Sequence, residues 1–240
     1  MTAISGSSES GRLGERNRRS RADLPGAPSI KIRSLIGIYG GTFDPVHLGH
    51  LRTALEVAEG VGLLEVRFLP CRVPPHRPPP RFSPEERLRF LRLALQDAPP
   101  FFKIDTRELE REGPSYMVDT LHDLREELGE EIPLALIVGF DAFLGLPSWH
   151  RWRELFRLAH LVVMTRAGVS GEPSPELREV LAGCRCDDPE TLKRRPAGLV
   201  HFQRVSLLEI SGTRIRQLLE RGRSVQYLLP EPVYLALQAP

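Results

Sequence analysis

The chain has 240 residues, of which 41% are hydrophobic and 27% are charged. This length is enough for one large α/β domain or two small ones, and the composition is ordinary for a soluble globular protein. The formal net charge of +2 is too small to indicate a nucleic-acid partner, and no apolar run approaches the roughly 20 residues of a membrane span. The three cysteines (Cys71, Cys184 and Cys186) follow no zinc pattern, so we expect reduced thiols and a cytoplasmic protein.

The first part of the chain differs in composition from the rest. Residues 1–34 are rich in serine, glycine and arginine and contain neither an aromatic residue nor the apolar segment of a secretory signal. We expect a disordered basic tail over residues 1–34 and a folded domain over residues 35–240. A basic arm that contacts an anionic partner is the alternative interpretation of the tail.

Strands and helices are predicted to alternate along the domain. Apolar runs bounded by turn residues predict strands at 34–40, 63–70, 101–109, 133–143, 160–168 and 199–205. Apolar residues at helical spacing predict helices at 47–60, 83–98, 115–129, 148–159, 175–183, 211–222 and 230–238. Such alternation implies parallel strands joined by right-handed crossovers, with helices on both faces of the sheet. The predicted fold class is therefore α/β, a doubly wound Rossmann-like parallel sheet.

Local signals mark several element boundaries. Gly60 closes the first predicted helix and is expected to be its C-cap. Ser83, Pro84 and Glu86 form the capping-box pattern that begins a helix. Residues 71–82 are rich in proline, which is incompatible with a helix or a central strand, so they predict a stiff exposed loop.

The stretch GGTFDPVHLGH (residues 40–50) is the first candidate site. Gly40 and Gly41 end the first predicted strand, where the lack of side chains lets a ligand approach the backbone N–H groups. His47 and His50 fall in the first turn of the following helix and are predicted to point the same way. A helix N-terminus combined with glycine backbone binds anions, and imidazoles there add donors for phosphate oxygens.

The same stretch has two alternative interpretations. Histidines three apart on a helix can ligate one metal ion, but no third ligand stands at a recognisable spacing. A plain tight turn is the remaining alternative. The pattern is neither a P-loop nor a G-x-G-x-x-G motif, so phosphate binding through His47 and His50 is the preferred hypothesis, with no metal held by the protein.

These residues carry a resemblance to a known family. GGTFDPVHLGH resembles the H-x-G-H signature of the nucleotidylyltransferase superfamily, and ISGTRIR (residues 210–216) resembles its second phosphate motif. Between and beyond them, LPCRVPPHR, RELEREGPSYMVDTL, VGFDAF followed by SWHRW, and VQYLLPEPV resemble bacterial nicotinate-nucleotide adenylyltransferases in order and spacing. The resemblance covers roughly residues 35–237, so it implies that residues 35–240 form a nucleotidylyltransferase domain.

The resemblance implies an activity. Members of the family join ATP and nicotinate mononucleotide, release pyrophosphate and form deamido-NAD in NAD biosynthesis, with Mg²⁺ accompanying ATP. The nucleophile of this reaction is a phosphate monoester, whose second pKa is about 6, so it needs no protein base at neutral pH. The enzyme must supply alignment and charge neutralisation instead, which agrees with a site rich in hydrogen-bond donors.

The resemblance also implies which residues bind each substrate. His47 and His50 are the expected catalytic residues, with His50 the transition-state donor. The residues expected to bind ATP are Gly40, Gly41, Thr42, Phe43, His47, Gly49, His50, Asp141, Ser211, Thr213 and Arg216. Those expected to bind the mononucleotide are Arg77, Tyr116, Met117, Trp149 and Arg166. Asp141 is expected to bond ribose and Trp149 to stack on the pyridine ring, whereas Trp152 is the candidate core residue.

The chain departs from the family pattern at four positions. Arg77 replaces a common lysine, which keeps the charge but alters reach and geometry. Met117 replaces a threonine, Ala167 a proline, and Gly212 a serine, so a hydroxyl is lost at two of these positions. None of the four changes involves the histidines, and substrate preference is the property that they affect most.

Two classes of alternative function remain open at this point. One is a sister nucleotidylyltransferase acting on nicotinamide mononucleotide, phosphopantetheine or glycerol phosphate. The other is a non-catalytic nucleotide-binding or nucleic-acid-binding module that uses the basic tail. The favoured interpretation has small-molecule partners, without nucleic acid or membrane, and leaves a homo-oligomer open.

Overall fold

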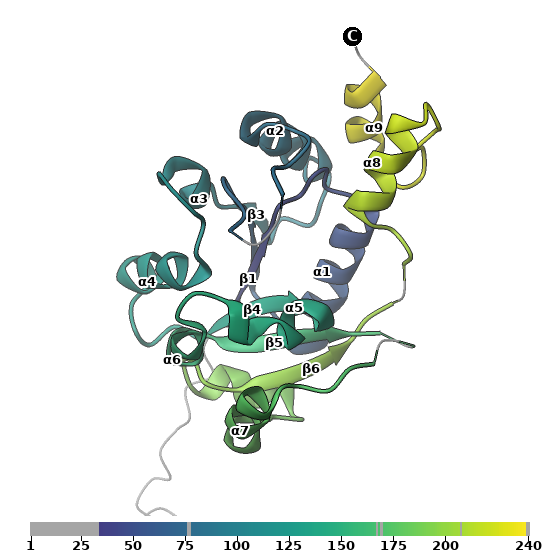
Figure 1. Cartoon of the computed structure of the whole chain (residues 1–240). Coiled ribbons are helices and arrows are strands. Elements are labelled where there is room, and N and C mark those ends of the chain that lie inside the picture. Colours follow the sequence, from purple (N-terminus) through teal and green to yellow (C-terminus); the bar gives the residue numbers. More distant parts are fainter. Residues whose placement is uncertain (1–33, 76–77, 167, 169, 207, 239–240) are drawn as a thin grey trace, which may run out of the picture. The chain divides into compact units, whose positions relative to one another are not determined.

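A computed structural model describes residues 34–75, 78–166, 168, 170–206 and 208–238. The predicted tail therefore lies outside the described residues, except for Ser34. The described strands form one six-stranded, wholly parallel sheet in the order β3-β2-β1-β4-β5-β6 (Figure 1). The strands are β1 (Ile36–Gly41), β2 (Glu65–Pro70), β3 (Phe102–Ile104), β4 (Leu134–Gly139), β5 (His160–Thr165) and β6 (Val200–Arg204).

Helices connect these strands and follow the last of them. The α-helices are α1 (Leu48–Val61), α2 (Pro84–Ala94), α3 (Arg107–Glu110), α4 (Met117–Leu128), α5 (Phe140–Leu144), α6 (Leu155–Leu158), α7 (Pro175–Cys184), α8 (Gly212–Glu220) and α9 (Glu231–Gln238). Short 3₁₀ helices are η1 (Leu146–Ser148), η2 (Trp152–Glu154) and η3 (Pro189–Arg194).

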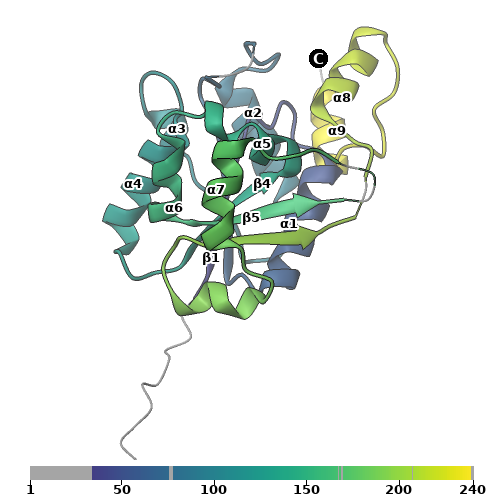
Figure 2. The ribbon, with the colours of Figure 1, turned by 60° about the horizontal axis from the view of Figure 1, so that its bottom comes forward.

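The sheet has a hydrophobic core on each face. Alternate residues of one strand point to opposite faces, and in β1 Ile38 and Tyr39 belong to different cores. The core that contains Tyr39 is built with α1, α2, α8 and α9, and the core that contains Ile38 with α4, α5, α6 and α7. Figure 2 shows α7 and α1 on opposite sides of β4 and β5. The predicted doubly wound α/β sheet is confirmed.

The strand order places the candidate site. The chain proceeds outward from β1 to β2 and β3, then returns to pair β4 with the other side of β1. In open parallel sheets, ligands bind at the carboxyl ends of the strands beside such a reversal. Gly40 and Gly41 end β1, so the stretch that follows them lies at this point of the sheet.

Two predicted strands are wrong in part, because each turns into a helix near its end. The strand expected at 101–109 is limited to β3, and α3 follows it. Asp105 ends this extended segment, since its carboxylate accepts hydrogen bonds from both the backbone and the side chain of Arg107. The strand expected at 133–143 stops at Gly139, which serves as the N-cap of α5.

Two helix predictions also need correction. The single helix expected at 148–159 is interrupted into η1, η2 and α6, because Arg151 has the left-handed conformation with φ of 50°. The first helix continues past Gly60, and its C-cap is Gly62, with φ of 66°. This is a backbone conformation that glycine adopts at little cost. The helix expected at 83–98 ends four residues early, at Ala94.

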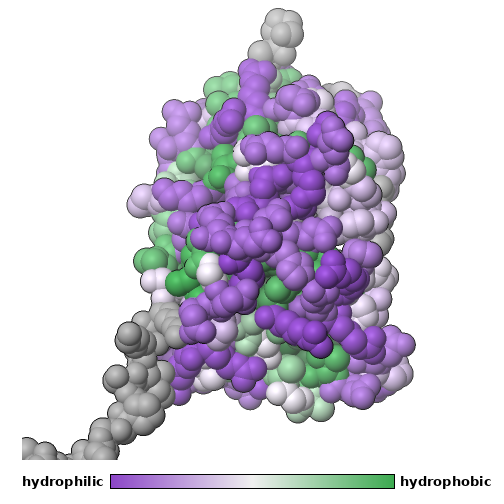
Figure 3. Space-filling model, turned by 90° about the vertical axis from the view of Figure 1, so that its left-hand side faces the viewer, coloured by the Kyte–Doolittle hydropathy of each residue, from purple (hydrophilic) through white to green (hydrophobic). Residues whose placement is uncertain are grey.

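The outer surface around α4 is polar. Figure 3, which faces the side of the molecule that bears α4, shows a mainly hydrophilic surface with small separate apolar areas. Ion pairs join the helix to its surroundings here, including Arg67 and Arg107 to Glu127 and Arg111 to Asp123. An amphipathic helix with one core-facing stripe accounts for this pattern. No helix within the described part of the chain is long and apolar enough to cross a membrane.

Two buried histidines predict a loss of stability in acid. Burial lowers the pKa of both His47 and His160 to about 4. The unfolded chain binds a proton at each position below pH 6.5, whereas the folded protein stays neutral until about pH 4. Each histidine therefore contributes stability that is complete above pH 6.5 and is lost as the pH falls toward 4. Between pH 7.5 and pH 5.0 the expected loss is about 2 kcal/mol for each residue.

The variant His160→Gln isolates one of these contributions. His160 is 0% exposed, and its ring bonds the Leu199 N–H and the Arg195 carbonyl. The variant is expected to be less stable at pH 7.5, but its free energy of unfolding in urea should fall by about 2 kcal/mol less on going to pH 5.0. Equal pH dependence in the two proteins would contradict this account.

Candidate active site

The N-terminus of α1 is built by the two histidines themselves. The His50 N–H donates to His47 Nδ1 and the His47 N–H donates to His50 Nδ1, each at 3.3 Å, so the pair forms a reciprocal capping box. The two rings stack with centroids 3.7 Å apart. The prediction that both rings lie in the first turn and point the same way is confirmed.

This cap determines which ring nitrogens can donate. Each Nδ1 accepts a backbone N–H, so the proton of a neutral ring resides on Nε2. His47 is 5% exposed and its pKa is lowered to about 4 by burial, so it is neutral at physiological pH. Both histidines therefore present Nε2–H groups rather than lone pairs at the start of α1.

Gly49 stands between the two histidines for a steric reason. A Cβ there would lie 3.0 Å from His47 Nδ1 and 3.4 Å from the Ile210 carbonyl oxygen. The close approach joins the first motif to the second, more than 150 positions later in the sequence. In the same turn, the Leu48 N–H donates to Leu228 O, whereas the Gly49 N–H has no partner among the described residues. Backbone amides in the first turn of a helix are suited to binding an anion.

The second motif begins α8 as predicted. Ser211 is the N-cap, and its hydroxyl accepts the Arg214 N–H at 3.2 Å. One turn later, Arg216 Nη1 donates to the Asp44 carbonyl at 2.7 Å and lies 3.2 Å from Asp44 Oδ2. Its Nη2 donates to Thr213 Oγ1 at 3.1 Å. The structure thus brings the two predicted phosphate motifs into direct contact.

Two buried charged residues of this region were missed by sequence reasoning. Asp44 is 7% exposed and Arg87 is 0% exposed. Arg87 Nη1 donates to Thr42 O at 2.7 Å, while its Nε and Nη2 donate to Phe82 O and Arg72 O, each at 3.3 Å. A signal existed for Arg87, because it falls on the buried stripe of α2 at helical spacing from Phe90 and the residues that follow.

The predicted mononucleotide residues lie on neighbouring elements. Tyr116 is the N-cap of α4, and its ring lies 4.4 Å from that of His150, the residue after Trp149. The Met117 methyl group packs against Gly40, since a Cβ built there would lie 2.6 Å from Met117 Cε. This contact brings the start of α4 to the carboxyl end of β1.

The remaining predicted residues occupy different positions around the sheet. Asp141 is exposed in the first turn of α5, just after β4. Trp149 is half-buried against the core that contains Ile38, whereas Trp152 is only 7% exposed, which confirms it as the core tryptophan. Arg166 is exposed directly after β5. Arg77 lies outside the described residues.

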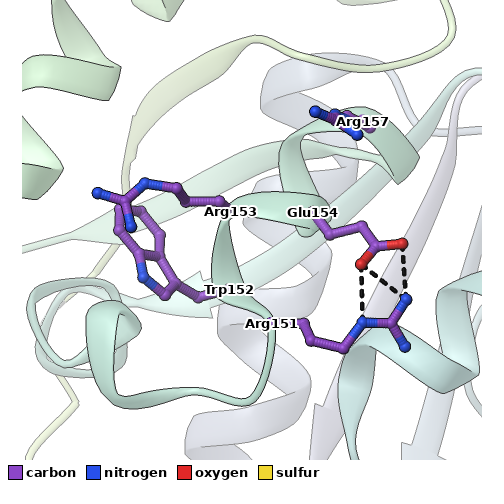
Figure 4. A pocket seen from close by; sticks show the side chains of 5 residues that line it. All are labelled: Arg151, Trp152, Arg153, Glu154 and Arg157. Atoms are coloured by element: carbon purple, nitrogen blue, oxygen red, sulfur yellow. Dashed lines mark hydrogen bonds and ion pairs between the residues drawn. The ribbon is translucent and has the colours of Figure 1, made fainter.

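Three contacts fasten the segment after Trp149 to one face of α4. Besides the Tyr116–His150 ring pair, Asp119 Oδ1 lies 3.5 Å from Arg151 Nη1, and His122 Nε2 lies 2.8 Å from Glu154 Oε1. Figure 4 shows Glu154 paired with Arg151 beside a cavity of about 300 Å³, with Arg153 over the Trp152 ring. Glu154 therefore contacts α4 through His122 and also pairs with Arg151, which itself contacts the helix.

A second cavity, of about 560 Å³, has Leu48 and Leu51 among its lining residues. The predicted substrate residues line neither this cavity nor the one beside Glu154. Within the described ranges, no three histidine, cysteine or carboxylate side chains form a group that could hold a metal ion. The geometry at the carboxyl end of β1 instead supplies imidazole N–H groups, two helix N-termini and a guanidinium.

Comparison with known proteins agrees with this geometry. The Cytidylyltransferase-like family model matches residues 38–218, which span both motifs. The protein named probable nicotinate-nucleotide adenylyltransferase of Methylococcus capsulatus is 56% identical over 199 residues, covering 83% of this chain and 94% of its own. The protein of the same name from Halorhodospira halophila is 53% identical over 198 residues, covering 82% and 90%.

Solved structures show the same fold. The nicotinic acid mononucleotide adenylyltransferase of Plasmodium falciparum complexed with NaAD matches with a TM-score of 0.60 at 18% identity, covering 85% of this chain and 95% of that one. Its complex with APC matches with a TM-score of 0.58 at 16% identity, with the same coverage. The close sequence relatives show that this chain belongs to the nicotinate-nucleotide adenylyltransferase family of nucleotidyltransferases, in agreement with the histidine-capped helix α1 and the serine-capped helix α8.

Proposed function

We propose that this protein transfers the adenylyl group of ATP to nicotinate mononucleotide, forming deamido-NAD and pyrophosphate in NAD biosynthesis. The observation that carries the proposal is the contact of Asp44, in the turn that precedes the H-x-G-H helix, with Arg216 of the ISGTRIR helix. These two segments lie at opposite ends of the domain sequence, and the fold brings them to one edge of the sheet.

Each part of the site has a role in this reaction. The phosphate of the mononucleotide attacks the α-phosphate of ATP, and pyrophosphate leaves. His50 Nε2–H donates to the charge that develops at the α-phosphate, while His47, the Gly49 amide and the glycine backbone of β1 hold the nucleotide. Ser211, Thr213 and Arg216 bind the β- and γ-phosphates. Because the attacking phosphate is already anionic, no protein residue serves as a base.

Magnesium belongs to the proposal as a companion of ATP. Mg²⁺ commonly binds through substrate phosphates while it keeps several water molecules. The donor set at the start of α1 and α8 suits the phosphate oxygens of a metal–nucleotide complex, and the metal supplies charge neutralisation there. We further propose that the enzyme acts in the cytoplasm on small-molecule substrates.

The mononucleotide is proposed to bind where α4 begins, near the carboxyl end of β1. Tyr116 and Met117 come from the start of this helix, and Trp149 from the segment fastened to it. Stacking of Trp149 on the pyridine ring contributes affinity through an aromatic face. Asp141, after the adjacent strand β4, is proposed to accept a hydrogen bond from a ribose hydroxyl, and Arg166 to bind the mononucleotide phosphate.

Product analysis tests the proposed function. Purified protein with Mg²⁺-ATP and nicotinate mononucleotide should release one pyrophosphate for each deamido-NAD formed. Phosphopantetheine and glycerol phosphate, offered in its place, should release none above background. ATP binding without pyrophosphate release would show a non-catalytic nucleotide-binding module, and turnover of another phosphate alone would reassign the second substrate.

Glu154→Gln should weaken mononucleotide binding selectively. The substitution removes the charge that pairs Glu154 with Arg151 and His122, so the turn that carries Trp149 is held less firmly against α4. Because Glu154 is half-exposed and Arg151 and His122 are more exposed still, the effect should be modest, a rise of about threefold in the KM for nicotinate mononucleotide. The KM for ATP should not change.

Glu172→Gln provides the matched control for this prediction. Glu172 is exposed and, like Glu154, is paired with an arginine, Arg178, at 3.8 Å, but it contacts neither α4 nor the turn after Trp149. Steady-state kinetics of the three proteins measure both constants. Equal changes in the two KM values for Glu154→Gln, or equal effects of the two substitutions, would contradict a positioning role.

A further inference from the structure

Asp44 connects three segments that are far apart in the sequence. Its carboxylate accepts the Arg81 N–H at Oδ2 (2.9 Å) and the Phe82 N–H at Oδ1 (3.0 Å), just before α2 begins. The same Oδ2 lies 3.2 Å from Arg216 Nη1 on α8. Its own backbone belongs to the first motif, three residues before His47. A single buried side chain thus links the first motif, the start of α2 and the second motif.

The arrangement restrains the guanidinium of Arg216 on two sides. Nη1 is bonded to the carbonyl and carboxylate of Asp44, and Nη2 to Thr213 Oγ1. A second ion pair, between Arg81 Nη1 and Glu220 Oε1 at 3.5 Å, joins the segment before α2 to α8 at the surface. An arginine side chain has large rotamer freedom, and ordering it when a ligand binds reduces affinity. These bonds place the guanidinium in one orientation before ATP arrives.

We propose that Asp44 is a positioning residue, whose buried carboxylate orients the Arg216 guanidinium in advance as a ligand for the ATP phosphates. The inference rests on the proposed role of Arg216 in ATP binding. In this role Asp44 acts on substrate only through Arg216. Its negative charge, which alone would repel a triphosphate, is balanced by Arg216 and by the N–H groups of Arg81 and Phe82.

A double-mutant cycle tests the proposal through the KM for ATP. Asp44→Asn keeps the size of the side chain but cannot accept from both backbone N–H groups and pair with Arg216, so KM should rise about tenfold. Arg216→Gln should raise KM by at least as much. In the double variant, Asp44→Asn should add less than about twofold, because the group that it orients is already absent.

The cycle distinguishes a positioning role from an independent effect of Asp44 on ATP binding. Fold-effects that multiply in the double variant would overturn the proposal, since they would show that Asp44 acts independently of Arg216. A lower KM for Asp44→Asn would also overturn it, since Asp44 would then act only through its charge. Glu108→Gln is the matched control, because Glu108 is a buried carboxylate (3% exposed) bonded to Thr120. Glu108→Gln should change the KM for ATP by the same factor whether or not Arg216→Gln is also present.

A measurement on the unaltered protein keeps the test valid if Asp44→Asn does not fold. In the full chain without ATP, NMR of the Arg216 guanidinium should show separate, slowly exchanging Nη–H signals, and the Arg81 and Phe82 amides should be protected from hydrogen exchange. Averaged Nη–H signals before ATP is added would overturn the proposal. Absence of adenylyl transfer by the unaltered protein would instead refute the proposed function, whatever the NMR result.

Discussion

Replacing His50 with alanine should reduce kcat by about 10²–10³-fold, because it removes a hydrogen-bond donor at the developing charge. The Nε2–H of this ring is the group concerned, since Nδ1 already accepts the His47 N–H at 3.3 Å. The substitution also removes half of the capping box of α1, which costs stability of about 1 kcal/mol. Turnover and unfolding must therefore be measured on the same proteins.

Two further variants separate the donor from the cap. The oxygen of an asparagine side chain lies near the position of Nδ1 and can still accept the His47 N–H, so His50→Asn keeps the cap but lacks the donor. The amide of a glutamine reaches the position of Nε2, so His50→Gln keeps a donor but not the cap. His50→Asn should lose turnover as His50→Ala does, and His50→Gln should retain more. The reverse order would show that His50 serves mainly to cap the helix.

Replacing Arg87 with methionine should lower the free energy of unfolding by about 3 kcal/mol. The carbonyls of Thr42, Phe82 and Arg72 accept part-buried hydrogen bonds and all lose their guanidinium donor. A buried acceptor left unsatisfied costs about 1–3 kcal/mol, and relaxation and water recover part of that cost here. The loss of the buried charge itself offsets part of this cost. Since Thr42 lies between β1 and the H-x-G-H turn, kcat/KM should also fall, by about tenfold.

Arg92→Met is the control for this prediction. Arg92 lies on the same helix but is exposed, so the substitution should change stability by less than about 0.5 kcal/mol. Arg87→Lys keeps the charge but cannot reach all three carbonyls, so its free energy of unfolding should lie between those of Arg87→Met and Arg92→Met. Urea unfolding at pH 7.5 measures all three. If Arg87→Met were as stable as Arg92→Met, Arg87 would not hold these loops together.

The elements that sequence predicts well are those with strong local patterns. The apolar runs of β1, β4 and β5 and the capping box of α2, in which Ser83 and Glu86 bond each other's backbone N–H groups, appear as expected. The failures arise where a local choice depends on backbone detail or tertiary contacts. Arg151 adopts a left-handed conformation that splits an otherwise helical pattern, and either Gly60 or Gly62 satisfies the sequence rule for a C-cap.

The site was predictable as a set of motifs but not as a network. His47, His50 and Ser211 follow from capping and phosphate-binding patterns that span only a few residues. Asp44 and Arg216 are 172 positions apart, and Arg87 and Thr42 are 45 apart. No periodicity reports contacts at such separations. The local sign of such a contact is a charged residue at a position that should be buried, as with Asp44 in an apolar turn and Arg87 on the buried stripe of α2. A buried charge of this kind must have hydrogen-bonding partners elsewhere in the fold.

The most direct test of the proposed activity compares two second substrates. With saturating Mg²⁺-ATP, kcat/KM should be measured for nicotinate mononucleotide and for nicotinamide mononucleotide on the full-length protein. We expect a preference for the nicotinate form of at least about tenfold, with deamido-NAD and pyrophosphate as the products. Equal rates, or a preference for the amide, would contradict the assignment of the second substrate.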